Sequence, residues 1–226
     1  MQSNILSQLL KDRAAKRAVV AATRLSDGAQ KLLYPSDKSQ ETWAVEAMSQ
    51  VLASDKSRIV TAPDGEEWFF NAFNPPLRLI VVGAVHIAQP VAVMGMLAGY
   101  DVTIVDPREA FASPARFPDT TVLCEWPDEA LAALAPDART AVVTLTHDPK
   151  LDDPALVVAL RSPAFYIGSL GSKKTHAARI ERLTAQGFDA AALARIHGPI
   201  GLSIGAKSPA EIAVSIMAQM TAVLRQ

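Results

Sequence analysis

The chain has 226 residues, of which half are apolar and a fifth are charged, and its formal net charge is −1. This length allows one large domain or a small domain followed by a medium one, and the near-zero charge excludes an overall field that attracts nucleic acid or a membrane. The single cysteine, Cys124, excludes an internal disulfide framework and a thiolate zinc cage. It is typical of a reducing compartment, so we expect a cytoplasmic protein.

Residues 1–74 predict a small α+β domain of two hairpins and helices. Its expected elements are a helix over 5–16, a hairpin over 17–34, a helix after Asp37 and a second hairpin over 57–73. Asp37 and Gln40 have the spacing of a capping box for the second helix. Residues 74–76 (NPP) form a stiff break, and we place the boundary with a second domain, 77–226, at this point.

From residue 77 onward strands alternate with helices, which predicts a Rossmann-like, doubly wound parallel sheet and an α/β fold class. The expected strands are 77–82, 101–105, 121–124, 140–145 and 164–167, and the expected helices are 86–98, 127–135, 152–161, 172–186, 189–195 and 208–224. Cys124, in the third strand, is expected in the core. Residues 79–100 carry no fixed charge, but Pro90 and the internal glycines favour a buried strand, a turn and a packed helix over a membrane span.

In such a sheet, ligands bind beyond the carboxyl ends of the strands. The first strand is followed by residues 83–88 (GAVHIA), which keep the first glycine and the final small residue of the dinucleotide fingerprint and replace its second glycine by Val85. Gly83 and His86 are therefore candidate binding residues, with an ordinary strand-to-helix turn as the alternative. The second strand is followed by Asp106, near the position of a ribose-binding carboxylate, and by Arg108, a phosphate candidate. A simple turn cap at Asp106 is the alternative.

The fourth strand is followed by His147 and Asp148, a pair suited to acid–base work or ligand orientation, or else to capping a turn. The fifth strand is followed by the richest anion signal of the chain, because glycines, hydroxyls and cations meet at the start of a helix. Its candidate binding residues are Gly168, Ser169, Gly171, Ser172, Lys173, His176 and Arg179. Cations in a first turn oppose the helix dipole, so a negative ligand or a merely solvated basic helix would explain them.

Three glycines and a proline within 198–205 predict a fixed loop, in which His197 and Gly201 are further candidates. A structural crossover is the alternative there. The four histidines of the chain all fall after a strand or in a loop on the predicted ligand side. No two of them have the short spacing of a metal site, so no metal site is predicted.

Residues 79–221 resemble the XdhC/CoxI family, the accessory proteins of xanthine dehydrogenase and related molybdenum hydroxylases. The resemblance is carried by residues 166–183 (YIGSLGSKKTHAARIERL), 197–216 (HGPIGLSIGAKSPAEIAVSI) and 145–152 (LTHDPKLD), and more weakly by 99–108 (GYDVTIVDPR). Many members of this family also have an N-terminal Ser-Gly-Gly-Cys motif. Residues 1–73 contain no cysteine, so the chain is similar to a short form without that motif.

The resemblance implies a non-catalytic maturation role. A protein of this kind is expected to bind molybdenum cofactor (molybdopterin), to help its sulfuration with a cysteine desulfurase, and to deliver it to a xanthine dehydrogenase-like molybdenum hydroxylase. The phosphate of the pterin would suit the loop at 168–176. We further expect a homodimer that binds neither nucleic acid nor a membrane.

Two other hypotheses remain open at this point. An NAD(P)-dependent oxidoreductase, or a protein that binds another nucleotide, is suggested by Gly83, Asp106 and Arg108. Val85 and the absence of lysine four residues after Tyr166 argue against it. The third hypothesis is an adaptor protein with a vestigial pocket, whose N-terminal hairpins pair with a partner through their edges.

Overall fold

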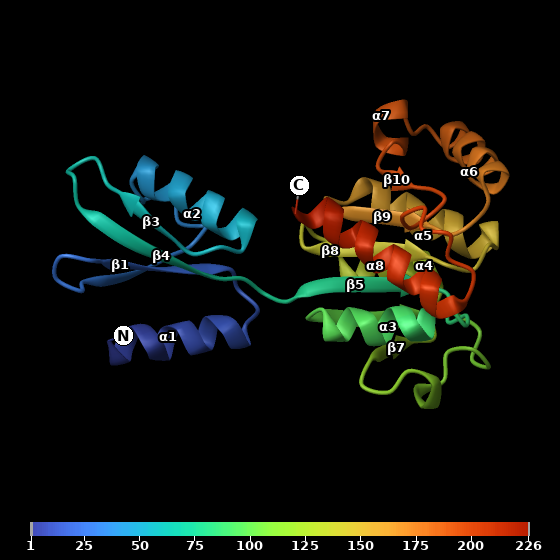
Figure 1. Cartoon of the computed structure of the whole chain (residues 1–226), viewed down its shortest axis with the longest axis horizontal. Coiled ribbons are helices and arrows are strands. Elements are labelled where there is room, and N and C mark those ends of the chain that lie inside the picture. Colours follow the sequence, from blue (N-terminus) through green and yellow to red (C-terminus); the bar gives the residue numbers. More distant parts are fainter. Residues whose placement is uncertain (1, 226) are drawn as a thin grey trace. The chain divides into compact units, whose positions relative to one another are not determined.

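Figure 1 shows the computed structural model of the chain, in which residues 2–225 are described. These residues divide into two compact units, with the division between Pro76 and Leu77. The second unit contains a six-stranded parallel sheet and the first an antiparallel four-stranded sheet, so the predicted fold class is confirmed. Among the described residues, no helix combines the length and the hydropathy that a membrane span requires.

The N-terminal unit is an antiparallel sheet of strand order β2-β1-β4-β3. Its elements are α1 (Ser3–Ala14), β1 (Val19–Arg24), β2 (Gln30–Leu33), α2 (Thr42–Ser54), β3 (Arg58–Thr61) and β4 (Glu67–Phe73). The two helices lie on opposite faces of the sheet in Figure 1. Because side chains alternate along a strand, Val20 and Ala22 of β1 pack under α2 together with Phe70 of β4.

The capping box expected at Asp37 and Gln40 is wrong. The Asp37 carboxylate accepts a hydrogen bond from the backbone N–H of Ser39 at 2.9 Å, which makes a local turn two residues long. Short acidic side chains often bond their own backbone in this way and so compete with a helix start. The helix α2 consequently begins only at Thr42, after the N-cap residue Glu41, whose side chain makes no capping hydrogen bond.

The second unit has the strand order β10-β9-β8-β5-β6-β7, with every pair parallel. The strands are β5 (Leu77–Val82), β6 (Tyr100–Val105), β7 (Thr121–Leu123), β8 (Thr140–Thr144), β9 (Tyr166–Ser169) and β10 (Ile196–His197). Counted within the unit, this is the 3-2-1-4-5-6 order of a Rossmann fold, whose strand order reverses between β5 and β8. That point is where such folds form a crevice for ligands.

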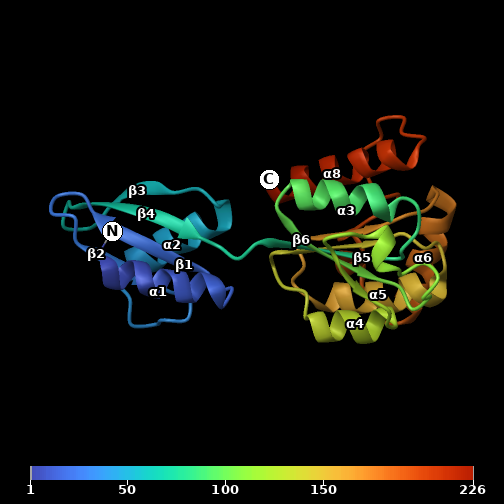
Figure 2. The same cartoon turned by 90° about the horizontal axis from the view of Figure 1, so that it is seen from below.

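Helices cover both faces of this sheet, as Figure 2 shows. They are α3 (Ala88–Leu97), α4 (Pro127–Leu134), α5 (Pro149–Arg161), α6 (Lys173–Ala185), α7 (Ala190–Leu193) and α8 (Pro209–Arg225), with a 3-10 turn η1 (Pro114–Arg116). Alternate residues of β5 enter two different cores: Leu79 and Val81 pack with α3 and α8, whereas Ile80 and Val82 pack with α4 and α5. A strand buried on both faces must be apolar throughout, which explains the uncharged stretch that begins at residue 79.

Three expectations in this unit need correction. The helix α5 begins at Pro149 and not at residue 152, because Asp148 is its N-cap and accepts a hydrogen bond from the backbone N–H of Lys150 at 2.9 Å. Residues 196–197 form a short strand, β10, where only a loop was expected, since Ile196 pairs with Ile167 of β9. Cys124 is exposed and not in the core, because β7 ends at Leu123.

The start of α8 has the capping box that its sequence predicts. The Ser208 backbone N–H donates to a Glu211 carboxylate oxygen at 2.8 Å, and the Glu211 N–H donates back to the Ser208 hydroxyl at 3.3 Å. Replacing Ser208 by alanine is expected to lower the free energy of unfolding by about 1 kcal/mol, as for other serine N-caps. Urea unfolding followed by circular dichroism measures this change. Ser203→Ala, in the exposed loop before α8, is the control expected to change nothing.

Candidate binding site at the carboxyl edge of the parallel sheet

The loops after β5 and β8 touch each other at the point where the strand order reverses. Gly83 has a φ of +102°, and a Cβ added to it would lie 2.4 Å from the methyl carbon of Thr146. A side chain at this position is therefore excluded both by the backbone conformation and by the neighbouring loop. Gly83 has a role in loop packing, and His86, three residues later, lies exposed in the same loop.

Asp106, at the end of β6, is fully buried and its carboxylate is fully hydrogen-bonded. One carboxylate oxygen accepts from the backbone N–H of Ala84 at 2.8 Å and from Arg108 Nη2 at 2.7 Å. The other accepts from the N–H and Nε of Arg108 at 3.0 and 2.8 Å. Burial alone would raise the pKa of Asp106, but these hydrogen bonds outweigh it and hold the pKa below its usual value. A carboxylate offers about four acceptor positions, and all of them are used.

A second buried carboxylate, Asp152 in the first turn of α5, organises the loop after β8. Its side chain accepts hydrogen bonds from the Thr146 hydroxyl at 2.7 Å and from the backbone N–H of His147 at 3.1 Å. Burial raises the pKa of Asp152. His147 is held in the left-handed region, at a φ of +62°, with its side chain exposed. Such a conformation in a non-glycine residue needs support from its surroundings, and Asp152 provides it.

Arg179 is a buried cation beneath the loop that follows β9. Only 1% of its surface is exposed, and its Nη2 donates to the Leu170 carbonyl oxygen at 2.9 Å. Nη2 also lies 3.8 Å from a carboxylate oxygen of Asp152. The Nε and Nη1 of Arg179 have no hydrogen-bond partner among the described residues. Buried donors are nearly always paired, so the two free donors mark Arg179 as a residue that can accept a further partner.

The N-terminus of α6 lies directly beside this arginine. A Cβ added to Gly171 would lie 3.7 Å from Arg179 Nη2. Ser172 is the N-cap, and its hydroxyl accepts from the backbone N–H of Thr175 at 3.1 Å. The first turn of α6 contains no acidic residue, while Lys173 is exposed there. The N–H groups at a helix start, together with an exposed and a buried cation, are an arrangement that can bind an anion.

Two of the four histidines, His176 and His197, are packed against neighbouring residues of the fold and are not simply exposed at the carboxyl edge of the sheet. His176 Nδ1 is buried without a partner, and a Cβ on Gly198 would lie only 2.1 Å from it. The His197 ring stacks on Tyr166, with ring centroids 4.8 Å apart and planes 9° from parallel. Burial lowers the pKa of His197, and burial together with the Arg179 charge lowers that of His176.

These two histidines make the stability of the protein depend on pH. The pKa of each is lower in the folded state than the value near 6.5 of an unfolded chain, so below about pH 6.5 the unfolded state binds more protons. The free energy of unfolding should therefore fall as the pH is lowered from 7.5 to 5.5. Urea unfolding at the two pH values tests this, and His176→Asn with His197→Asn should flatten the difference. If the double variant loses as much free energy of unfolding between pH 7.5 and pH 5.5 as the unmodified protein, groups other than these histidines cause the pH dependence.

Three further candidates are used by the packing around β9. A Cβ on Gly168 would lie 2.5 Å from the Ile200 side chain, and the hydroxyls of Ser169 and Thr144 are 2.5 Å apart in the core. Gly201 has a φ of +90° and donates its N–H to Gln219 of α8 at 2.8 Å. These contacts fix the loop at 198–205 against the sheet and α8.

The structure brings only some of the predicted site residues together. Those brought together around one centre are Gly171, Ser172, Lys173 and Arg179, with His147 held by the same Asp152 carboxylate that faces the arginine. Asp106 and Arg108 form an ion pair apart from this group, and Asp106 also accepts a hydrogen bond from the backbone N–H of Ala84. The sequence did not indicate Asp152 as a site residue, because a carboxylate in the first turn of a helix commonly interacts with the helix dipole. Its hydrogen bonds with Thr146 and His147 show that it supports the loop after β8.

The parallel-sheet unit matches a known family of domains. Residues 79–220 fit the model described as the XdhC Rossmann domain. The chain is 30% identical over 151 residues to the molybdenum cofactor insertion chaperone PaoD of Escherichia coli, covering 67% of this chain and 41% of PaoD. It is also 30% identical over 153 residues to a probable xanthine dehydrogenase subunit of Bacillus subtilis, covering 67% of this chain and 44% of that protein.

A solved structure resembles the chain over both units. The crystal structure of a xanthine dehydrogenase from Bacillus halodurans matches 98% of this chain and 64% of its own chain, with a TM-score of 0.72 and 25% sequence identity. Each of the two curated relatives is more than twice as long as the region it shares with this chain, since the match covers 41% and 44% of them.

Proposed function

Because the chain belongs to the family defined by the XdhC Rossmann domain, we propose that it is an accessory protein that binds molybdenum cofactor for a xanthine dehydrogenase-like molybdenum hydroxylase. The name of the relative PaoD, a molybdenum cofactor insertion chaperone, supports this role. The protein would carry the cofactor as cargo and would not itself catalyse the hydroxylation. In the same proposal, a cysteine desulfurase supplies sulfur to the cofactor before it reaches the hydroxylase.

The single observation that carries the proposal is the buried arginine beneath the start of α6. The pterin of the cofactor has a phosphate, which accepts several hydrogen bonds and carries negative charge. The backbone N–H groups of the first turn of α6 and the ammonium group of Lys173 would bind its oxygens. The Nε and Nη1 of Arg179 are buried without a hydrogen-bond partner and would add a buried positive charge. The residues present therefore fit a phosphate-bearing ligand.

The alternative of an NAD(P)-dependent oxidoreductase has less support from the geometry. Its ribose would need a free acceptor on Asp106, and Arg108 with Ala84 uses all of them. Val85 also stands where the fingerprint needs a glycine close to the pyrophosphate. Calorimetric titration with NAD(H) and NADP(H) separates the two functions, since tight nicotinamide binding would favour the alternative.

The experiment that tests the proposed function is cofactor retention. The full chain is purified from cells that make molybdenum cofactor and from cells that lack it, and bound pterin is measured by fluorescence after oxidation. We expect pterin on the protein only from the first source, at a stoichiometry set by the binding site. Absence of pterin, while a known cofactor-binding protein purified in parallel retains it, would overturn the proposal.

We extend the proposal to a homodimer that forms through the outer face of α3. This helix carries no charged residue, and Val93 and Leu97 are 49% and 83% exposed. An uncharged face can pack against its own copy without repulsion about a two-fold axis. Light scattering is expected to give twice the 24.1 kDa mass of the chain. Leu97→Lys should lower the measured mass toward that of the monomer, because it places a charge in the proposed interface. A monomeric unmodified protein would refute the dimer.

A further inference from the structure

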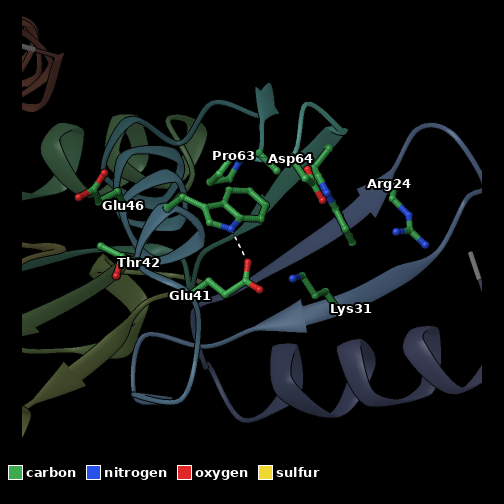
Figure 3. Close-up of a pocket in the computed structure, with 10 residues that line it drawn as sticks. Arg24, Lys31, Glu41, Thr42, Glu46, Pro63 and Asp64 are labelled. Atoms are coloured by element: carbon green, nitrogen blue, oxygen red, sulfur yellow. Dashed lines mark hydrogen bonds between the residues drawn. The ribbon is translucent and has the colours of Figure 1, made fainter.

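The N-terminal unit contains an open cavity that lies outside the matched Rossmann region. Its volume is about 780 Å³, within the range of small-molecule sites, and Figure 3 shows the side chains that line it. The register of the sheet explains its place: Arg24 at the end of β1 pairs with Trp68 at the start of β4, so both hairpin turns lie at this end. The helix α2 starts here and contributes Trp43.

Two indole rings form the aromatic part of this cavity. The ring centroids of Trp43 and Trp68 are 6.4 Å apart and the planes are tilted by 52°. Phe70, two residues after Trp68 and on the same face of β4, is fully buried under α2, whereas Trp68 is only partly buried. The partial exposure of the two indoles leaves aromatic surface in the cavity to which a flat ring can stack.

Arg24 and Lys31 are the cations that line this cavity, and the one near both indole rings is Lys31. Its ammonium nitrogen lies 4.6 Å from the ring centroid of Trp68 and 5.6 Å from that of Trp43. Among the described residues, no ion pair to a carboxylate is recorded for Lys31, whereas Arg24 is held by Asp27 at 2.9 and 2.6 Å. Lys31 therefore keeps an unmatched positive charge beside two aromatic rings.

Three carboxylates, those of Glu41, Glu46 and Asp64, also line the cavity. Glu41 accepts a hydrogen bond from the indole nitrogen of Trp43, drawn as the dashed line in Figure 3. Asp64 accepts from the backbone N–H of Glu66 at 3.0 Å. In the same view the carboxylate of Glu46 points away from Lys31. Hydrogen bonds from these neutral donors leave the carboxylates charged, so the positive charge at the aromatic surface is local to Lys31, and the first turn of α2, which has no side-chain cap, adds to it.

We propose that this cavity binds a small planar aromatic or heteroaromatic molecule that carries a carboxylate or a phosphate. The ring stacks on the exposed indole surface of Trp43 and Trp68, and the anionic group pairs with Lys31. This inference is independent of the cofactor site, since it uses only residues of the N-terminal unit. It gives that unit a ligand of its own.

Two probe pairs that differ only in the anionic group test the proposal: nicotinate with nicotinamide, and AMP with adenosine. Each is titrated into the full ¹⁵N-labelled chain, and the three tryptophan indole N–H signals are followed, after assignment by Trp→Phe variants. We expect saturable shifts at Trp43 and Trp68 and none at Trp126, which is in the other unit. At least one anionic probe should bind about tenfold more tightly than its neutral partner, the effect of one charged hydrogen bond.

The variant Lys31→Gln should reduce the affinity for the anionic probe to that of the neutral one and leave the neutral one unchanged. Lys38→Gln, an exposed lysine of the same unit outside the cavity, is the matched control and should have no effect. A preference for nicotinate identifies a carboxylate ligand, and a preference for AMP a phosphate. The proposal is overturned if charged and neutral probes bind equally, if no probe shifts Trp43 and Trp68, or if Lys31→Gln behaves like its control.

Discussion

Replacing Arg179 by methionine is expected to lower the free energy of unfolding by about 3–5 kcal/mol, the range found when one partner of a buried ion pair is removed. The reason is that Asp152 would then be left as a buried carboxylate without a facing cation. Arg179 and Asp152 each have about 1% of their surface exposed, so water cannot replace the lost partner. Urea unfolding of the purified variant measures the loss.

A double-mutant cycle distinguishes this pairing from a simple loss of packing. Asp152→Asn removes the charge with little change in shape, and the double variant removes both charges. If the two groups stabilise each other, the double variant should lose clearly less than the sum of the single losses. Strict additivity would mean that Arg179 stabilises the fold only through its hydrophobic stem and its bond to the Leu170 carbonyl.

The second large effect concerns binding and not stability. Lys174 is exposed beside Lys173 in the first turn of α6, so we extend the proposed phosphate contact to it. Changing Lys173 and Lys174 together to glutamine is expected to weaken retention of molybdenum cofactor roughly a hundredfold, the loss of two charged hydrogen bonds. The stability of the free protein should stay the same or rise slightly, because these cations oppose the dipole of α6 at its first turn. Retained pterin and the thermal midpoint are measured on the same sample.

A matched control for this variant is the double change of Lys11 and Lys56 to glutamine, two exposed lysines of the N-terminal unit. It alters the net charge equally and should leave retention unchanged. Equal losses in both variants would point to a long-range charge effect. Unchanged retention in the Lys173 and Lys174 variant would support the adaptor hypothesis, in which the pocket is vestigial.

The alternation of strands and helices was enough to predict the parallel sheet and the edge at which its polar loops gather. That prediction succeeds because buried parallel strands are apolar on both faces, as Leu79 to Val82 show with at most 1% exposure. A strand of two residues, such as β10, carries no such pattern. The strand β10 is therefore visible only through its pairing with β9, and the exposure of Cys124 depends on where the edge strand β7 stops.

The roles of individual site residues were harder to predict than their positions. Asp106 and Asp152 both follow patterns that suggest an available carboxylate or a dipole partner, yet both are buried and bonded to neighbouring loops. Whether a side chain faces a ligand or a neighbouring loop depends on contacts between segments distant in sequence. The role of Arg179 could not be predicted from the sequence either, since its burial and its two unpaired donors become apparent only in three dimensions.

A crystal structure of the protein loaded with molybdenum cofactor tests the central claim most directly. We predict that the phosphate lies at the first turn of α6, within hydrogen-bond distance of Lys173 and of backbone N–H groups, with Arg179 behind the loop. A cofactor held elsewhere, with the start of α6 facing only solvent, would contradict the account.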